Sequence, residues 1–476
     1  MFVYNPDGFE PQRHLPPKLH PYSDCARVLV HLIETARVFN KLHTTEFVPR
    51  KAQYLRRLVH KEMYLPIRDA LLGAGVLEMD RHYVIGKHSC GFRIGERFKD
   101  CAFRRYRLSD RAAIRRLQRV RAEHCPFLND PIHKGLHEWL TRLEVDFDDA
   151  WAFLRGLELP ADVLRSRHLS LAMLRDREFF FKPDLHGRVH TNVTNLWSGF
   201  RQFLRCDGEG LVNLDIGNSQ PLFFGLVVLN WIRSEKREQD YTSNSFVPPP
   251  SPFPFHYDAE SIGTSESGWS LKDLPDDLRR YLQITEQAQF YEHMMAALGI
   301  QINKPNRDAF KEDFFKKVFY CKPKFYTKER KAFLTEFPTV LEHITRLKQD
   351  DPRNAPLALQ RVESEFVIGT VCKRILEDSP ETPLWTIHDS IMTSASRGEF
   401  VRKVMQEEFA KLGVHPRLLI EVLAEEPAVA KQMHPQRSGV ILSEIGTGLL
   451  DGDPVTLPLQ SGTDRHQEVF PLVSAS

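Results

Sequence analysis

The spacing of apolar residues divides the chain into a helical first part and a later part that contains strands. Up to about residue 180, apolar side chains recur at helical intervals, as in 26–42 and 51–72, with a short β segment within 83–103. Short alternating runs then predict strands in 181–235 and again in 370–426. We expect an α+β fold in which these two later segments share one antiparallel sheet.

Three further segments complete the predicted organisation. Residues 271–369 have helical periodicity and are expected to form a helical subdomain beside the sheet. Residues 236–270 include a Pro- and Ser-rich run, which predicts an extended insertion rather than a packed element. Turn residues recur throughout 427–476, so we expect this tail to be loosely ordered or laid along the surface.

Two of the predicted strands each deliver an aspartate. The run 384–393 reads as a β-hairpin with His388 and Asp389 at its tip, and the strand 210–215 ends in Asp215. A lone His-Asp pair is more often a pair of turn residues. Two carboxylates on adjacent strands, however, are what a two-metal phosphoryl-transfer site needs, because Mg²⁺ prefers carboxylate oxygens. Asp215 and Asp389 are therefore the predicted catalytic metal ligands, for two Mg²⁺ ions or, alternatively, Mn²⁺.

A second informative stretch is the predicted helix 306–320. At four-residue steps, Arg307, Lys311, Phe315 and Phe319 would share one face. Two cations followed by two aromatic rings would hold the triphosphate of a nucleotide and cover its base. An amphipathic helix with core phenylalanines and surface cations is the alternative, and the spacing taken alone favours it.

The most basic stretch of the chain, 104–121, offers a nucleic-acid contact. Arg111, Arg115 and Arg119 fall on one face of a predicted helix, and only Asp110 and Glu123 lie near enough in the sequence to pair with its arginines. Uncompensated arginine clusters are typical of phosphate-backbone binding. A solvated helix face that pairs with acids elsewhere in the fold is an equal alternative.

Composition limits the remaining possibilities. Charge nearly balances, with 65 Lys+Arg against 63 Asp+Glu, so nucleic-acid affinity has to come from local clusters. The seven cysteines contain no C-x-x-C pair, which suits a reducing cytosol. No run approaches a membrane span and the first residues contain no signal core, so we expect a cytoplasmic protein without a membrane partner. No acidic pattern of a proofreading exonuclease is visible.

Taken in order, these motifs resemble the polymerase core of family A DNA polymerases and of the related single-subunit phage-type RNA polymerases. The resemblance covers roughly 185–423, half the chain. The matching segments are 187–191 (Gly-Arg-Val-His-Thr), 214–220 around Asp215, the 307–319 helix face, 333–344 with Phe337-Pro338, 357–365 with Gln360 and Glu365, 387–390 (Ile-His-Asp-Ser) and 418–422.

The resemblance implies a right-hand polymerase architecture. It would have an antiparallel palm sheet (181–235 and 370–426), helical fingers (271–369) and a mostly helical, thumb-like nucleic-acid-binding region (1–180). By the same resemblance, Arg307 and Lys311 steady the triphosphate, Lys311 protonates the leaving pyrophosphate, and Phe315 stacks on the nucleotide, with Phe319 beside it. The residues implied to hold the nucleic acid or orient the primer end are Arg188, Arg201, Gln360 and His388.

Departures from the family pattern keep the substrate open. The family's DNA enzymes carry a Glu, which excludes the ribose 2′-OH, where this chain has Gln220, and the last motif ends in Ser390 as in the RNA enzymes. Tyr320 stands one place off the expected aromatic position. We expect a DNA polymerase without proofreading that extends a primer 3′-OH on a DNA primer-template with nucleoside triphosphates. The alternatives are an RNA polymerase or primase-like enzyme, with RNA as a partner, and an inactive nucleic-acid-binding palm protein.

Overall fold

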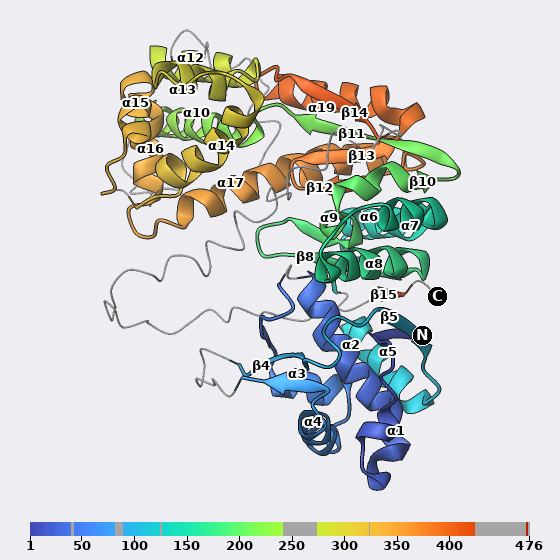
Figure 1. Ribbon diagram of the computed structural model, residues 1–476. Coiled ribbons are helices and arrows are strands. Elements are labelled where there is room, and N and C mark those ends of the chain that lie inside the picture. The colour runs from blue at the N-terminus through green and yellow to red at the C-terminus, as the bar shows by residue number, and fades with distance from the viewer. Residues whose placement is uncertain are drawn as a thin grey trace. The chain divides into compact units, whose positions relative to one another are not determined.

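The computed structural model describes residues 1–39, 42–80, 89–123, 126–240, 274–322, 324–423 and 473–474. The chain forms two compact units, each of which is described by itself (Figure 1). Unit 1 comprises Met1–Lys182, His190–Gly210 and Thr456–Ser476, and unit 2 comprises Pro183–Val189 and Leu211–Val455. Helices and antiparallel strands occur in both units, which confirms the mixed α+β class.

Unit 1 is mainly helical. Its elements are β1 (Phe2–Pro6), α1 (Pro11–His14), η1 (Pro17–Tyr22), α2 (Ser23–Phe39), β2 (Val48–Pro49), α3 (Ala52–Leu58), α4 (Tyr64–Gly73), β3 (Leu77–Met79), β4 (Gly91–Ile94), β5 (Phe103–Arg107), α5 (Arg111–Glu123), η2 (Pro126–Asn129), α6 (Pro131–Arg142), β6 (Glu144–Val145), α7 (Phe147–Arg155), α8 (Ala161–Arg175), β7 (Glu178–Phe179), α9 (Asn192–Asn195), η3 (Ser198–Phe203) and β10 (Leu204–Cys206). Two short strands, β8 (Phe181–Pro183) and β9 (Val189–Thr191), straddle the unit boundaries.

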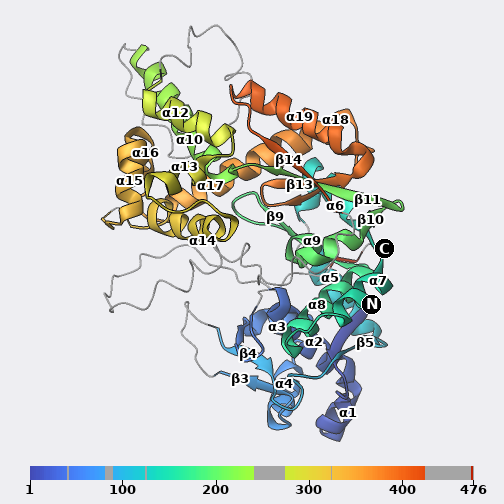
Figure 2. The ribbon, with the colours of Figure 1, turned by 45° about the horizontal axis from the view of Figure 1, so that its top comes forward.

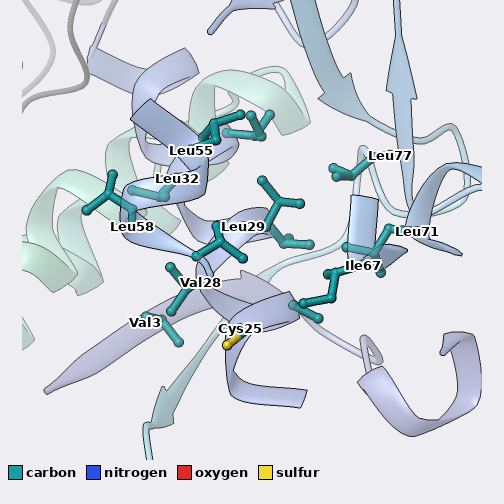
Figure 3. Close-up of a cluster of buried hydrophobic side chains, with 14 of the residues drawn as sticks. Val3, Cys25, Val28, Leu29, Leu32, Leu55, Leu58, Ile67, Leu71 and Leu77 are labelled. Atoms are coloured by element: carbon teal, nitrogen blue, oxygen red, sulfur yellow. The ribbon is translucent and has the colours of Figure 1, made fainter. Parts of the chain in front are cut away.

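The core of unit 1 forms around α2, which is buried along most of its length. Figure 3 shows Val28, Leu29 and Leu32 of this helix packed among side chains from α3 and α4, including Leu55 and Ile67. Burial of these aliphatic side chains is the main stabilising contribution that this part of the chain can make. The apolar residues that recur at helical intervals in the N-terminal region therefore form the hydrophobic core of unit 1.

One predicted helix of unit 1 is wrong in its length. The pattern over 51–72 predicts a single helix, but the chain forms α3 and α4 with a break between them. The break has a local cause, because the Nδ1 atom of His60 accepts hydrogen bonds from the backbone N–H groups of Glu62 (3.3 Å) and Met63 (3.1 Å). These hydrogen bonds stabilise the turn at residues 61–63, which separates the two helices.

The strands of unit 1 form antiparallel pairs. β1 pairs with β5, and β4 lies between β2 and β3. β4 and β5 account for the β segment predicted within 83–103, although residues 81–88 lie outside the described part of the chain. β10 pairs with β6, and β15 (Val473–Ser474) pairs with β7.

Unit 2 combines one sheet with a group of helices (Figure 2). Its elements are β11 (Glu209–Ile216), whose first two residues belong to unit 1, followed by α10 (Ser219–Asp240), α12 (Asp276–Glu286), α13 (Phe290–Ala297), α14 (Lys304–Phe314), the π-helical segment η6 (Phe315–Phe319), α15 (Lys328–Glu336), α16 (Pro338–Leu347), α17 (Asn354–Ser364), the π-helical segment η7 (Glu365–Cys372), α18 (Lys373–Asp378), β12 (Trp385–Ile387), β13 (Ser390–Ser394), η8 (Ala395–Arg397), α19 (Gly398–Lys411) and β14 (Leu418–Val422).

The sheet of unit 2 brings together strands that are far apart in the sequence. β13 pairs with β11 and with β12, and β14 pairs with the other edge of β11, all antiparallel. Helix α19 packs on this sheet next to β13 and β14 (Figures 1 and 2). The predicted pairing of the segments 181–235 and 370–426 in one antiparallel sheet is confirmed.

Two predicted segments, 236–270 and 427–476, extend beyond the described residues. α10 continues through Asp240, so the insertion predicted from residue 236 begins as helix. Residues 241–270 of that insertion and nearly all of the tail 427–476 lie outside the described residues. No helix within the described ranges is both long and apolar enough to cross a membrane.

Candidate functional site

The two predicted carboxylates come together at one end of the unit 2 sheet. In the β11–β13 ladder Leu214 is paired with Ile391, and extending this register by one residue sets Asp215 opposite Ser390, the neighbour of Asp389. Asp389 lies in the two-residue turn between β12 and β13, in which His388 has a φ of 56°. Left-handed backbone is less costly for histidine than for most residues and makes a tight hairpin. The hairpin thus fixes Asp389 beside Asp215.

The electrostatics of this pair indicate a place for cations. Burial, followed by the charge of Asp389, raises the pKa of Asp215 from 3.8 to about 7, while the charge of Lys311 acts in the opposite direction. The side-chain hydroxyl of Ser219, at the start of α10, donates a hydrogen bond to Asp389 Oδ2. Two half-buried carboxylates that repel each other gain from a bound cation.

The donor set fits Mg²⁺ better than a soft metal. No cluster of three or more His, Cys, Asp or Glu side chains capable of holding a metal occurs among the described residues. A site with only two carboxylates leaves coordination positions for water and substrate oxygens, as Mg²⁺ prefers. Asp215 and Asp389 are thus suited to hold Mg²⁺ together with a phosphate-bearing substrate.

Arg188 lies inside this site rather than on an exposed surface. Its guanidinium is 2.5 Å from the Glu363 carboxylate of α17, and both residues are buried. Burial acts to lower the pKa of Arg188, but the charges of Glu363 and Asp389 outweigh it and the pKa is raised. Burial raises the pKa of Glu363 to about 7, and the charge of Asp389 acts in the same direction. A direct contact of Arg188 with nucleic acid, as the resemblance implied, would first have to break this ion pair.

The cations of the predicted helix face lie over a tyrosine of α13. The guanidinium of Arg307 is 5.4 Å and the ammonium of Lys311 is 5.9 Å from the ring centre of Tyr291. Arg307 also forms an ion pair with Glu292, whereas Lys311 is exposed. Lys311 is therefore the more accessible cation and is close enough to Asp215 to affect its pKa.

The aromatic half of this face differs from the prediction. Phe315–Phe319 form a π-helical segment, in which the N–H of Tyr320 donates to the carbonyl of Phe315 at 2.8 Å. One turn thereby gains an extra residue, so that Tyr320 replaces Phe319 on the face of Lys311 and Phe315. Phe319 is buried and stacks on Phe224 at 4.5 Å. Phe319 is thus a core residue, as is Phe315, which agrees with the alternative of an amphipathic helix with core phenylalanines, and a contact with a nucleotide stays a prediction.

Tyr320 occupies the position that Phe319 was expected to fill. Its ring is 5.5 Å from that of Phe315, and its hydroxyl is buried. Burial raises the pKa of Tyr320, and Arg188, Glu363 and Gln220 also influence it. Tyr320 therefore connects the helix to the residues around the carboxylates. Phe315 itself is only 1% exposed, so a nucleotide base would reach its ring only after the ring is uncovered.

The remaining predicted nucleic-acid residues divide between the two units. In unit 2, Gln360 is buried on α17 and His388 is half-buried in the hairpin turn. In unit 1, Arg201 is half-buried on η3. Arg111, Arg115 and Arg119 are exposed along α5, and Arg119 lies 3.8 Å from Glu123.

Several residues of the site were missed by sequence reasoning. Ser219, Tyr291, Glu292 and Glu363 were assigned no role, although each contacts a predicted site residue. Ser219 could have been found, because it stands four residues after Asp215 at the start of a helix. The contact between Glu363 and Arg188 spans 175 residues, and no local pattern indicates it.

The chain was compared with protein-family models, curated sequences and solved structures. No family model and no curated protein sequence matches the chain. Among solved structures, the POL domain of Pol1 from M. smegmatis, in complex with DNA primer-template and dNTP, is similar with a TM-score of 0.26 and 10% sequence identity. The match covers 64% of this chain and 65% of that chain, less than two thirds of its length. At this TM-score the likeness assigns no activity.

Proposed function

We propose that this protein is a template-directed nucleotidyltransferase that extends a nucleic-acid 3′-OH with nucleoside triphosphates, in the first place a DNA polymerase without proofreading. The observation that carries the proposal is the close approach of Asp215 and Asp389, with the exposed cation Lys311 acting on Asp215. Two carboxylates and a nearby cation are the groups that phosphoryl transfer with a pyrophosphate leaving group requires.

The metal site would be formed by Asp215 and Asp389. When bound, Mg²⁺ supplies activation of the attacking 3′-OH and neutralisation of charge on the leaving pyrophosphate. Ser219 holds the Asp389 carboxylate by donating a hydrogen bond to it. A carboxylate fixed in this way loses less conformational freedom on binding a ligand.

The helix face supplies positioning and proton transfer. Lys311 is exposed on α14 and can reach a triphosphate, where its ammonium donates a proton to the departing pyrophosphate. Arg307 can bind the same phosphates once its ion pair with Glu292 opens. Tyr320 and Gln220 lie close together.

The second candidate function is synthesis of RNA. The observation that favours it is Gln220, an uncharged side chain beside the Tyr320 hydroxyl, where the resembling DNA enzymes carry an acid. An amide can donate a hydrogen bond to a ribose hydroxyl, which a carboxylate cannot do. Discrimination against ribonucleotides by charge is therefore absent at this position.

The test is incorporation on primed DNA and RNA templates with each dNTP and rNTP, in Mg²⁺ and in Mn²⁺. We expect wild-type extension that EDTA abolishes. Asp389→Ala should lower the rate by at least about 10³-fold, because metal-ligand carboxylates contribute several kcal/mol to transition-state stabilisation. The matched control is Asp378→Ala, an exposed carboxylate of α18, which should extend normally.

Four outcomes separate the alternatives. Faster use of dNTPs supports the DNA polymerase, and faster use of rNTPs supports the RNA enzyme. No incorporation by the folded wild-type protein under any condition would reject the enzyme and favour a nucleic-acid-binding protein. Equal incorporation by wild type and Asp389→Ala would reject the proposed site itself.

A further inference from the structure

Two neighbouring aromatic side chains of unit 2 are exposed. Phe325 is 61% and Tyr326 is 86% accessible, although Phe319 before them and Phe333 after them are fully buried. They lie between η6 and α15, on the connection that follows the helix bearing Lys311. Exposed large apolar groups that gather at one place mark a surface that contacts something else.

Four lysines lie close to these rings in the sequence. Lys322, Lys324, Lys328 and Lys331 are exposed, and none of them pairs with an acidic side chain in the described part of the chain. The preceding lysines behave differently, since Lys316 lies 2.7 Å from Glu312 and Lys317 lies 2.8 Å from Asp313. The six residues Lys322, Lys324, Phe325, Tyr326, Lys328 and Lys331 are called the aromatic–lysine loop below.

The connection between η6 and α15, which carries Phe325 and Tyr326, is held in place at both ends, and Lys328 and Lys331 follow in α15. At its start, the buried ammonium of Lys348 donates to the carbonyls of Val318 (2.9 Å) and Cys321 (3.1 Å). At its end, the Thr327 hydroxyl caps α15 by accepting from Arg330 N at 3.1 Å. Within it, the N–H of Phe325 donates to Lys322 O at 3.0 Å. Anchored in this way, the loop presents its aromatic rings at a low cost in conformational entropy.

We propose that the aromatic–lysine loop binds single-stranded nucleic acid. Aromatic faces next to free cations suit a strand whose unpaired bases can stack while its phosphates meet the lysines. In a duplex the bases already stack on one another, so Phe325 and Tyr326 would gain nothing from it. A single Phe and a single Tyr bury too little apolar area for stable membrane anchoring.

This inference goes beyond the carboxylate site, because none of the six residues belongs to it. It rests on the proposed function for one point, the identification of the bound strand as a template. Binding without nucleotide or divalent metal measures the loop alone. Loss of catalysis in Asp389→Ala should leave it unchanged, so the failure of either proposal is recognisable.

The test is fluorescence anisotropy of the full chain with labelled dT20, rU20 and a blunt DNA hairpin. Phe325→Ala/Tyr326→Ala should weaken dT20 or rU20 binding by roughly tenfold or more, since stacking is worth about 1–3 kcal/mol per base, and should leave the hairpin unaffected. Lys322→Gln/Lys324→Gln/Lys328→Gln/Lys331→Gln should flatten the slope of log K against log salt by up to about 2–3 units. The stronger of the two single strands identifies the chemistry of the template.

Matched controls keep the result interpretable. Lys316→Gln removes a nearby lysine that is already paired, and Ile302→Ala removes an apolar side chain, 53% exposed, outside the loop. Both controls should bind like wild type, and all variants should melt like it, because the altered residues are exposed. Unchanged single-strand affinity in the double alanine variant would overturn the proposal. Equal loss of hairpin binding would do so too.

Discussion

Two helices carry cations at four-residue intervals, but only the first keeps its four-residue series on one face throughout. In α5 of unit 1, Arg111, Arg115 and Arg119 are all exposed on one side, while Ala113, Leu117 and Val120 are buried on the other. In α14 and η6 of unit 2, the four-residue series from Arg307 holds as far as Phe315 and then fails. The difference is the extra residue in the π-helical turn.

Residue spacing is a reliable guide in a regular α-helix but not across a π-helical turn. A regular α-helix keeps residues four apart on one face, so a simple count places the arginines of α5 correctly. A π-helical turn adds a residue and rotates everything after it, and such turns gather at functional sites. The shift in η6 buries Phe319 and brings Tyr320 close to Arg188, Glu363 and Gln220.

The largest expected effect comes from Phe319. It is fully buried and packs against Phe224, Phe290 and Phe333. Phe319→Ala should therefore lower the free energy of unfolding by about 3–5 kcal/mol, as large-to-small changes in a core do. Chemical denaturation followed by circular dichroism measures this loss. A loss of unfolding free energy below about 1 kcal/mol would indicate that Phe319 lies on the surface face that its spacing predicts.

The next effect concerns the lysine that closes the π-helical turn. Burial lowers the pKa of Lys348 from 10.5 to about 8. Between these pH values the unfolded chain holds a proton that the folded chain releases. Stability should thus rise with pH across this window, by up to about 3 kcal/mol, and this gain is lost again as the pH falls to about 8.

Lys348→Met isolates this contribution. The difference in unfolding free energy between wild type and variant should grow from pH 8 to pH 10.5, because other titrating groups cancel in the comparison. Lys316→Met, at an exposed lysine, serves as the control and should give a constant difference. Parallel curves for Lys348→Met would mean that its ammonium keeps an ordinary pKa.

A smaller effect is expected at Tyr320. Tyr320→Phe keeps the ring that packs on Phe315, so the free energy of unfolding should change by less than about 1 kcal/mol. Removal of the hydroxyl beside Gln220 should instead change the KM for one sugar type about fivefold, the value of one hydrogen bond. Steady-state kinetics with dNTPs and rNTPs measure it. Equal KM changes for both sugars would separate Tyr320 from sugar recognition.

The smallest effect on stability is expected in α5. Replacing Arg111, Arg115 and Arg119 with Gln should leave the melting temperature nearly unchanged, since all three side chains are exposed. If they contact phosphates, the slope of log K against log salt for duplex binding should flatten by up to about 2–3 units. An unchanged slope would end the binding interpretation of this face and leave it as a solvated surface.

The parts of the site that the sequence predicts are those governed by local periodicity. Alternating residues before Asp215 and around Asp389 indicate strands, and two-residue periodicity leaves little freedom in where the carboxylates point. Arg307 and Lys311 follow from regular helical spacing in the same way. The cation face and the carboxylate pair could therefore be identified before the fold was known.

The parts that could not be predicted depend on tertiary packing. Nothing in Phe-Phe-Lys-Lys-Val-Phe marks a π-helical turn, which is stabilised by contacts of Phe319 with distant helices and by the capping of Val318 O by Lys348. The pairing of Arg188 with Glu363 likewise joins residues 175 positions apart. The motif match predicted that Arg188 contacts nucleic acid, whereas in the structure Arg188 is buried and pairs with Glu363 of the same chain.

The most direct test of the central claim is to locate the metal ions. Crystals with Mn²⁺, a primer-template and a non-hydrolysable nucleotide would give anomalous peaks at each ion. We expect two peaks about 3.5–4 Å apart, both bound by the carboxylates of Asp215 and Asp389, as two-metal phosphoryl transfer requires. Peaks that avoid either carboxylate, or a bound nucleotide without metal at this end of the sheet, would contradict the proposed site.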